Sequence, residues 1–124
     1  MMTDRPHKQL QVWARSMDLV TQVYRITREF PSSERFGLAT QMQRAAVSVP
    51  SNIAEGAARR SRNEYVQYLY TARASLSELD TQLDIAQRLG FVDRDTYERL
   101  FSSCNDIGRM LNALIASLSR PRSP

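Results

Sequence analysis

Apolar residues recur along most of this 124-residue chain at the spacing of amphipathic helices, and no stretch of any length alternates as a strand does. The first pattern runs from about Gln9 to Glu29 and carries two adjoining apolar stripes: Leu10, Trp13, Met17, Val20 and Tyr24 in one, and Val12, Leu19, Val23, Ile26 and Phe30 in the other. A helix that is apolar over more than one seam is usually buried on two sides. Pro31 predicts its end, because the residue before a proline is pushed out of the α region.

A second apolar pattern runs from about Leu38 to Arg60 and contains a proline. Pro50 cannot donate the backbone hydrogen bond to residue 46 and its ring clashes with that carbonyl, so we expect one kinked helix rather than two. Gly56 lies late in the same segment. It marks either a close approach to another helix or the beginning of the helix end.

The third and fourth patterns have the clearest boundaries. Ser61 and Glu64 have the spacing of a capping box, Gly90 stands where a left-handed C-cap is expected, and Asp93 suits a helix N-terminus. Apolar residues then recur at steps of three and four, first at Tyr65, Leu69, Ala72, Leu76, Leu79, Leu83 and Ala86, and later at Leu100, Cys104, Ile107, Leu111, Leu114 and Leu118. Both segments are therefore expected to be long helices.

These four patterns predict one all-α domain. Connections of only a few residues force sequential helices to lie antiparallel, which gives an up-down-up-down four-helix bundle over residues 1–119. Residues 120–124 lack apolar content, and we expect them to form a disordered tail. No linker or internal repeat indicates a second domain.

The rarity of catalytic residue types argues against an enzyme. Cys104 is the only cysteine and His7 the only histidine, so a Cys/His zinc cluster cannot form within one chain. Cys104 lies on a core stripe and is interpreted as a small buried hydrophobe. Asp80 and Asp84, one helical turn apart, are interpreted as a solvated surface rather than metal ligands. We expect no enzymatic activity, no cofactor and no membrane span, and a cytoplasmic protein.

Positive charge is concentrated in the first half of the chain. Residues 1–62 carry ten basic and five acidic residues, a net charge of +5, whereas residues 63–124 carry seven and eight, a net charge of −1. Arginine supplies all but one of the basic residues, and its planar fork suits phosphate and carboxylate groups. The pattern favours an anionic partner, with an arginine-rich genome as the alternative explanation.

Three of these arginines cluster where the second predicted helix gives way to the third. Arg59, Arg60 and Arg62 surround a helix start, where backbone amides and the helix dipole already favour an anion. They form either a clamp for a phosphate backbone or a solvated turn whose charge completes the preceding helix. Arg44 lies earlier in the second predicted helix. We count it with Arg59, Arg60 and Arg62 as a candidate nucleic-acid-binding residue.

The second helix also carries a stripe of small polar residues beside its apolar one. Ser48, Ser51, Asn52 and Glu55 recur there, flanked by Arg44 and Arg59. An ordinary exposed face is more often built from long Glu, Lys and Gln side chains. We therefore favour a hydrogen-bonded contact between helices or between subunits over a ligand site.

The chain resembles a known family through residues spread over nearly its whole length. The most specific segment is Ser48 with Asn52-Ile53-Ala54-Glu55-Gly56, and further matching positions are Trp13, Tyr24, Phe30-Pro31, Gly37-Leu38, Gln41, Arg44-Ala45-Ala46, Arg59, Ser61, Glu64-Tyr65, Leu69, Ala72, Ser75, Glu78-Leu79, Ile85-Ala86 and Leu89-Gly90. In these residues it is similar to the four-helix proteins encoded by intervening sequences of bacterial 23S rRNA genes.

The resemblance implies a four-helix bundle that assembles as a homopentameric barrel and has no enzymatic activity. The accessory protein of diversity-generating retroelements, which is similar in fold, binds nucleic acid and a reverse transcriptase. We therefore expect a homo-oligomer that binds nucleic acid, such as structured RNA, through its arginine-rich surface. The alternative is an assembly adaptor whose basic surface binds an acidic protein partner, such as a nucleic-acid-handling enzyme.

Overall fold

The computed structural model describes His7 and residues 10–121, and these contain four long helices and no strand. The helices are α1 (Gln11–Thr27), α2 (Leu38–Ala57), α3 (Arg62–Arg88) and α4 (Arg94–Ser119), with a single 3₁₀ turn, η2 (Ser32–Glu34), between the first two. The expected all-α class is confirmed. Part of the expected tail, residues 122–124, lies outside the described residues.

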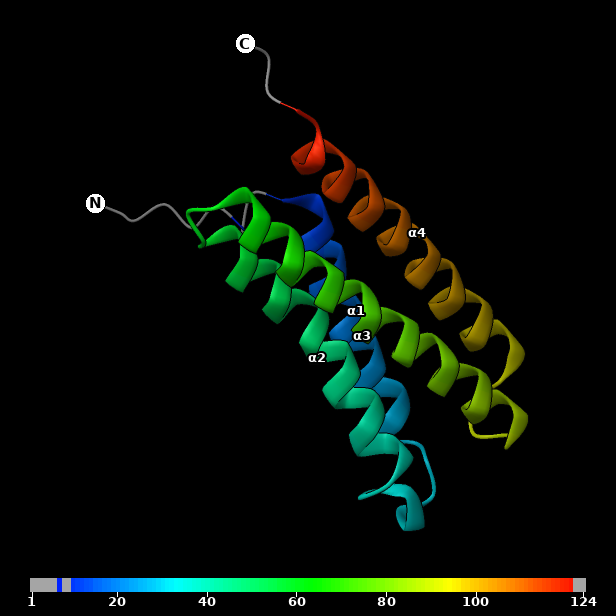
Figure 1. The fold of residues 1–124 in the computed structure, drawn as a ribbon. Helices are drawn as coiled ribbons and strands as arrows, with labels where there is room; N and C mark the ends of the chain where they lie inside the picture. Colours follow the sequence, from blue (N-terminus) through cyan, green and yellow to red (C-terminus); the bar gives the residue numbers. More distant parts are fainter. Residues whose placement is uncertain (1–6, 8–9, 122–124) are drawn as a thin grey trace.

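The four helices pack around a shared core. Each helix contacts two others, α1 against α2 and α4, and α3 against α2 and α4. In Figure 1 the α1–α2 and α3–α4 connections lie at one end of the molecule, and the α2–α3 turn lies at the other end with the last turn of α4. The largest fully buried apolar side chains come from all four helices: Leu19, Val23, Met42, Val49, Ile53, Leu69, Leu79, Leu83, Leu100, Ile107 and Leu111.

Local signals in the sequence set the ends of α3 and the start of α4. The Ser61 hydroxyl accepts a hydrogen bond from the Glu64 amide at 3.2 Å, and the Asp93 carboxylate accepts one from the Thr96 amide at 2.8 Å. Gly90 has a φ of 79°, and the next amide reaches back to the Ala86 carbonyl at 2.9 Å. This is the Schellman geometry expected of a left-handed glycine C-cap. The caps at Gly90 and Asp93 are confirmed, and so is the Ser61 half of the predicted capping box.

Gly56 marks a close approach between α2 and α3. A Cβ atom built on Gly56 would lie 2.9 Å from side-chain atoms of both Tyr65 and Tyr68 and 3.1 Å from the Tyr65 carbonyl oxygen. Any larger residue would therefore push the helices apart. Of the two explanations that the sequence left open for Gly56, the structure supports close helix approach, one residue before α2 ends at Ala57.

The two apolar stripes of α1 are buried to different extents. Val12, Leu19 and Val23 are buried, whereas Met17 and Tyr24 on the other stripe remain 42% and 44% exposed. Leu10, Trp13 and Val20 of that second stripe are half-buried and pack against the core, so the expectation that α1 is buried on two sides is met only in part in the single chain. The second stripe also forms one wall of an open groove, described below.

Candidate nucleic-acid interface

The three arginines at the α2–α3 turn differ in how they are held. Arg59 donates hydrogen bonds of 2.8 Å to both the Glu55 carboxylate and the Tyr68 hydroxyl, and its guanidinium carbon lies 4.8 Å from the centre of the Tyr68 ring. Glu55 therefore offsets much of the Arg59 charge. Since these contacts must be broken or shared to bind a phosphate, Arg59 is the least available of the three.

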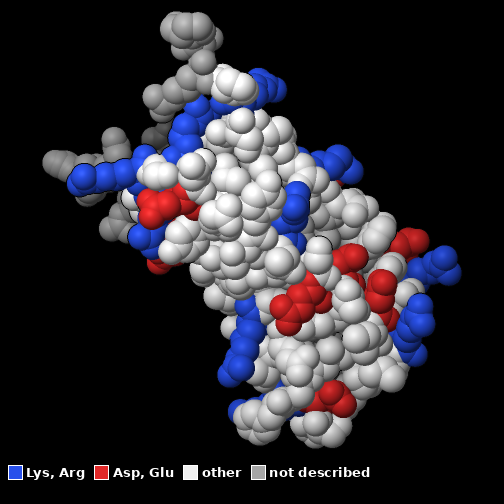
Figure 2. Space-filling model, in the orientation of Figure 1, with Lys and Arg blue, Asp and Glu red and all other residues white. Residues whose placement is uncertain are grey.

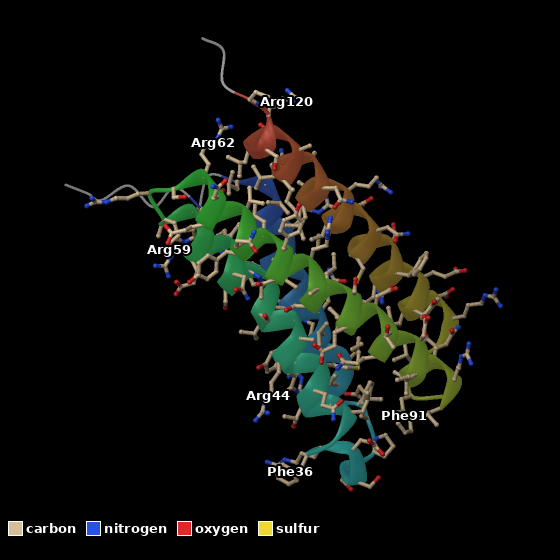
Figure 3. The ribbon with its side chains drawn as sticks, viewed as in Figure 1. Phe36, Arg44, Arg59, Arg62, Phe91 and Arg120 are labelled. Atoms are coloured by element: carbon tan, nitrogen blue, oxygen red, sulfur yellow. The ribbon has the colours of Figure 1, made fainter. Side chains whose placement is uncertain are left out.

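Arg62 connects the start of α3 with the end of α4. Its guanidinium donates to the Ser117 carbonyl at 3.1 Å, and together with Arg120 it lines a shallow hollow between the two helices. Figure 3 shows Arg59, Arg62 and Arg120 at the same end of the molecule, and Figure 2 shows Lys and Arg side chains gathered there. Arg120 is assigned to the tail from the sequence because residues 120–124 lack apolar content. It lies 58 residues from Arg62 in the sequence, and only the fold brings the two residues to one hollow.

Acidic residues leave most of this charge uncompensated. In the described part of the chain, the ion pairs involve Arg15, Arg59, Arg94 and Arg109, and none involves Arg60, Arg62 or Arg120. Arg60 is exposed on the turn itself. We call Arg60, Arg62 and Arg120 the arginine cluster. Arg60 and Arg120 are exposed, whereas Arg62 is half-buried and donates to the Ser117 carbonyl. Glu55 and Glu64 lie at the same end of the molecule, and neither forms an ion pair with the cluster.

Arg44 does not join the arginine cluster. It is exposed on α2, and the 13 residues that separate it from Ala57 correspond to about 20 Å along a helix. Figure 3 places it near the η2 end, at the opposite end of α2 from Arg59. The four arginines singled out in the sequence therefore lie on two separate surfaces.

The polar stripe of α2 is divided between two environments. The Ser48 and Ser75 hydroxyls lie 2.7 Å apart across the α2–α3 contact, and the Asn52 amide donates to both the Ser48 hydroxyl, at 2.9 Å, and the Ser48 carbonyl, at 2.8 Å. Ser51 and Glu55 are exposed. Ser75 was not predicted as part of this contact, although it is one of the positions at which the sequence resembles the family.

The interpretation of Asp80 and Asp84 as a solvated surface is wrong. Both lie in the α3–α4 contact, where the Tyr97 hydroxyl donates to the Asp84 carboxylate at 2.5 Å and one Asp80 oxygen is buried. Burial raises the pKa of Asp80, and the Asp84 carboxylate raises it further. Burial, and to a smaller extent Asp80, also raises the pKa of the Cys104 thiol to about 12, which keeps this buried thiol protonated at neutral pH. The expected burial of Cys104 is confirmed.

The described residues contain neither a candidate metal site nor a helix that could span a membrane. No group of three or more His, Cys, Asp or Glu side chains there is arranged to hold a metal ion. None of the helices formed by these residues has the length and hydrophobicity that a bilayer span requires.

Replacing Tyr97 with phenylalanine should lower the free energy of unfolding by about 1 kcal/mol, the typical loss for one intramolecular hydrogen bond. The hydrogen bond to Asp84 is the main cause that raises the pKa of Tyr97 from 10.0 to about 12. Because the folded pKa is the higher one, this stabilisation is complete below pH 10 and is lost as the pH rises towards 12. Urea titrations followed by circular dichroism should show this alkaline loss in the wild type and a smaller one in the variant.

The control for this variant is Tyr24→Phe, which removes a hydroxyl from a largely exposed ring. It should leave both the neutral-pH stability and the alkaline loss unchanged. If Tyr97→Phe retains the full alkaline loss of the wild type, the Tyr97–Asp84 hydrogen bond is not its source.

An apolar groove runs between α1 and α2 on another side of the molecule. Its walls are almost wholly apolar, with Trp13, Met17 and Val20 from α1 and Val47, Pro50, Ser51 and Ala54 from α2. Val47 is 40% exposed there. Exposed apolar surface of this kind, gathered along two helices, is typical of a surface that contacts another molecule.

The sequence and the fold both connect the chain with known proteins. Residues 8–113 match the model of the family described as 23S rRNA-intervening sequence protein. The fold is similar to the crystal structure of a protein of unknown function from the S23 ribosomal protein family of Bacteroides thetaiotaomicron VPI-5482, with a TM-score of 0.79 and 21% identity over 85% of this chain and 95% of that chain. The search of curated proteins gave no significant match. Because the family model spans most of its length, the chain belongs to the 23S rRNA-intervening sequence protein family.

Proposed function

We propose that this protein is a non-enzymatic homo-oligomer that binds nucleic acid, and that the arginine cluster is its principal contact. The observation that carries the proposal is that Arg62 and Arg120 line one hollow beside the turn that holds Arg60, and that none of the three forms an ion pair within the described residues. Such a surface meets phosphates without reading base edges. Structured RNA suits it, because a folded backbone presents several phosphates within reach of one compact cluster.

The architecture that presents the cluster is an antiparallel up-down-up-down bundle, and we propose that its copies close into a homopentameric ring. The apolar groove between α1 and α2 supports self-association, since the exposed side chains of Met17 and Val47 belong to one continuous apolar surface formed by two helices. If the groove contacts a different face of the next copy, the contacts form a closed ring when the rotation that relates successive copies closes on itself.

The nucleic-acid proposal is tested by replacing Arg60, Arg62 and Arg120 together with glutamine. Each phosphate that the variant no longer neutralises should reduce the slope of log affinity against log salt by roughly 0.9 on duplex DNA and about 0.7 on a single strand. We expect the slope on duplex DNA and on a ribosomal RNA fragment to become shallower by about two, with similar losses for every sequence. The Ser61–Glu64 cap is untouched and the variant loses only the exposed Arg62–Ser117 hydrogen bond, so the helical fold should be retained.

A matched control removes the same charge elsewhere. Arg94→Gln, Arg99→Gln and Arg109→Gln together change three exposed arginines of α4, two of which form ion pairs with acidic neighbours. This triple variant should keep most of the wild-type salt slope. Equal losses in both variants would assign binding to net charge alone, and an unchanged slope in the cluster variant would place the contact elsewhere.

The competing proposal is an adaptor that binds an acidic protein through the same arginines. Capture of partners on the immobilised wild-type protein, with and without nuclease, separates the two. A partner that disappears after nuclease treatment supports nucleic-acid binding, whereas one that survives treatment and disappears with the cluster variant supports the adaptor.

A further inference from the structure

A second arginine-rich hollow lies at the other end of the bundle, where the chain passes from α1 through η2 into α2. Its volume is about 440 Å³, within the range of pockets that hold small ligands. The walls combine the last residues of α1, the connecting loop and the first turns of α2: Thr27, Arg28, Phe30, Pro31, Ser32, Arg35, Phe36, Ala39, Thr40 and Gln43. Three chain segments therefore build one concave site.

Phe36 is the most unusual residue of this hollow. Its side chain is 86% exposed, more than any other large apolar side chain described in the protein. The Arg35 guanidinium carbon lies 5.3 Å from the centre of the ring. Figure 3 shows Phe36 at the η2 end of the molecule, far from the arginine cluster. An exposed ring that packs on nothing in the core contributes little to folding, so its place on the rim calls for another explanation.

The charge around the hollow is positive. Arg28 and Arg35 line it, and neither forms an ion pair within the described residues. Arg44 follows the lining residue Thr40 by one helical turn, on the same side of α2. Two acidic residues lie next to lining residues in the sequence. Glu29 is exposed and forms no ion pair within the described residues, and the Glu34 carboxylate accepts the Leu38 amide at the start of α2 at 3.4 Å.

The inner wall is polar and held in place. The Gln43 amide donates to the Thr27 hydroxyl at 3.0 Å, and that hydroxyl donates in turn to the Val23 carbonyl at 2.8 Å. The Thr40 hydroxyl donates to the Arg35 carbonyl at 2.5 Å, which ties the loop to α2. The floor of the hollow is thus built before any ligand arrives.

We propose that this hollow binds an unpaired nucleotide of a nucleic acid, with the base stacked on Phe36 and the flanking phosphates on Arg28 and Arg35. An exposed aromatic ring beside uncompensated arginines is the combination by which proteins hold single-stranded nucleic acid. A duplex cannot use the ring, because its bases are already stacked. The site rests on the proposed function and adds a preference for unpaired nucleotides to it.

An acidic peptide is the other class of ligand that the arginines could hold. A carboxylate pairs with Arg28 or Arg35 but makes no use of the aromatic face of Phe36. The exposed ring therefore favours the nucleotide, and the peptide becomes an outcome of the test.

The decisive variant is Phe36→Leu, which keeps an apolar side chain but removes the aromatic face. Affinity for a fluorescently labelled, unstructured strand of about twelve nucleotides, measured by anisotropy, should fall roughly tenfold, the effect of losing one stacked base. Affinity for a duplex should be unchanged. Arg28→Gln with Arg35→Gln should make the salt slope on the single strand shallower by about 1.4.

The matched control is Phe101→Leu, which changes a 40% exposed phenylalanine of α4 outside the hollow and should leave single-strand binding unchanged. An unaltered single-strand affinity in Phe36→Leu, or equal losses on duplex and single strand, overturns the inference. So does a poly-glutamate peptide that competes with the strand and is equally sensitive to Phe36→Leu. The proposed function is tested separately, by whether duplex binding depends on the arginine cluster. The nucleotide site at Phe36 and the proposed function can therefore fail independently.

Discussion

Val47→Glu should convert the proposed homo-oligomer into single folded chains. Val47 is 40% exposed in the single chain and faces the apolar groove between α1 and α2, so a glutamate there can remain in water when the chain is alone. In an assembly that covers the groove, the same carboxylate would be buried without a partner, which costs several kcal/mol. Light scattering coupled to size exclusion should therefore show the mass of one chain, while circular dichroism retains the helical spectrum.

Thr71→Glu is the control for this variant. Thr71 is exposed on α3, outside the residues that line the groove, so the same substitution adds equal charge without touching the contact. This variant should keep the wild-type mass. An oligomer that tolerates Val47→Glu would place the contact on another face, and a wild-type protein with the mass of one chain would contradict self-association altogether.

Features set by neighbours in sequence were predictable. A serine three residues before a glutamate, an aspartate before a polar first turn and a glycine after an apolar seam each act through one or two backbone hydrogen bonds. Those bonds form at Ser61, Gly90 and Asp93 as the sequence indicates. The step pattern of three and four also identified most of the buried positions of α3 and α4. It missed Val66, Gln82 and Ile115, and it included Tyr65, Leu114 and Leu118, which are only half-buried.

Helix ends without such signals were less predictable. The second apolar pattern continues to Arg60, but α2 ends at Ala57, and the Arg59 amide bonds to the Gly56 carbonyl three residues back. At the end of α1, the Phe30 amide likewise bonds to the Thr27 carbonyl. Both ends tighten into shorter hydrogen-bonded turns, which apolar spacing alone does not distinguish from a continuing helix.

The composition of the candidate sites depends on contacts between segments far apart in the sequence. Arg120 joins Arg62 only because α4 ends where α3 begins, and Ser75 meets Ser48 across the α2–α3 contact. Phe36 is one apolar residue in a polar loop, and no spacing singles it out. Its significance lies in its exposure and in the arginines that surround it, which the pattern of apolar and polar positions cannot reveal.

The two stripes of α1 illustrate the same limit. Spacing shows that both are apolar, but it cannot show which one faces the core, because a core and an interface between copies select the same side chains. In the structure Leu19 and Val23 enter the core, while Trp13 and Met17 line the groove. The apolar positions of the sequence therefore include residues of the proposed interface between copies as well as residues of the core.

Pro50→Ala should have opposite effects on the single chain and on the assembly. α2 continues through Pro50, so the buried residue Ala46 lacks the hydrogen bond that an amide at position 50 would donate. Alanine restores that amide and is favoured over proline in a helix by about 3 kcal/mol. Replacing the proline ring with a methyl group reduces packing in the groove, and this loss offsets part of the gain. The free energy of unfolding should therefore rise by about 1–2 kcal/mol.

The same substitution should weaken the assembly, because Pro50 lines the groove and any bend that it imposes on α2 shapes the surface offered to the next copy. Stability is best measured by urea titration in the Val47→Glu background, where self-association cannot contribute to the unfolding free energy. Oligomer mass is measured by light scattering with Pro50→Ala alone. A variant that becomes more stable and keeps its oligomer mass would show that Pro50 has no role in shaping the contact between copies. A variant that loses stability would show that packing of the proline ring outweighs the missing hydrogen bond.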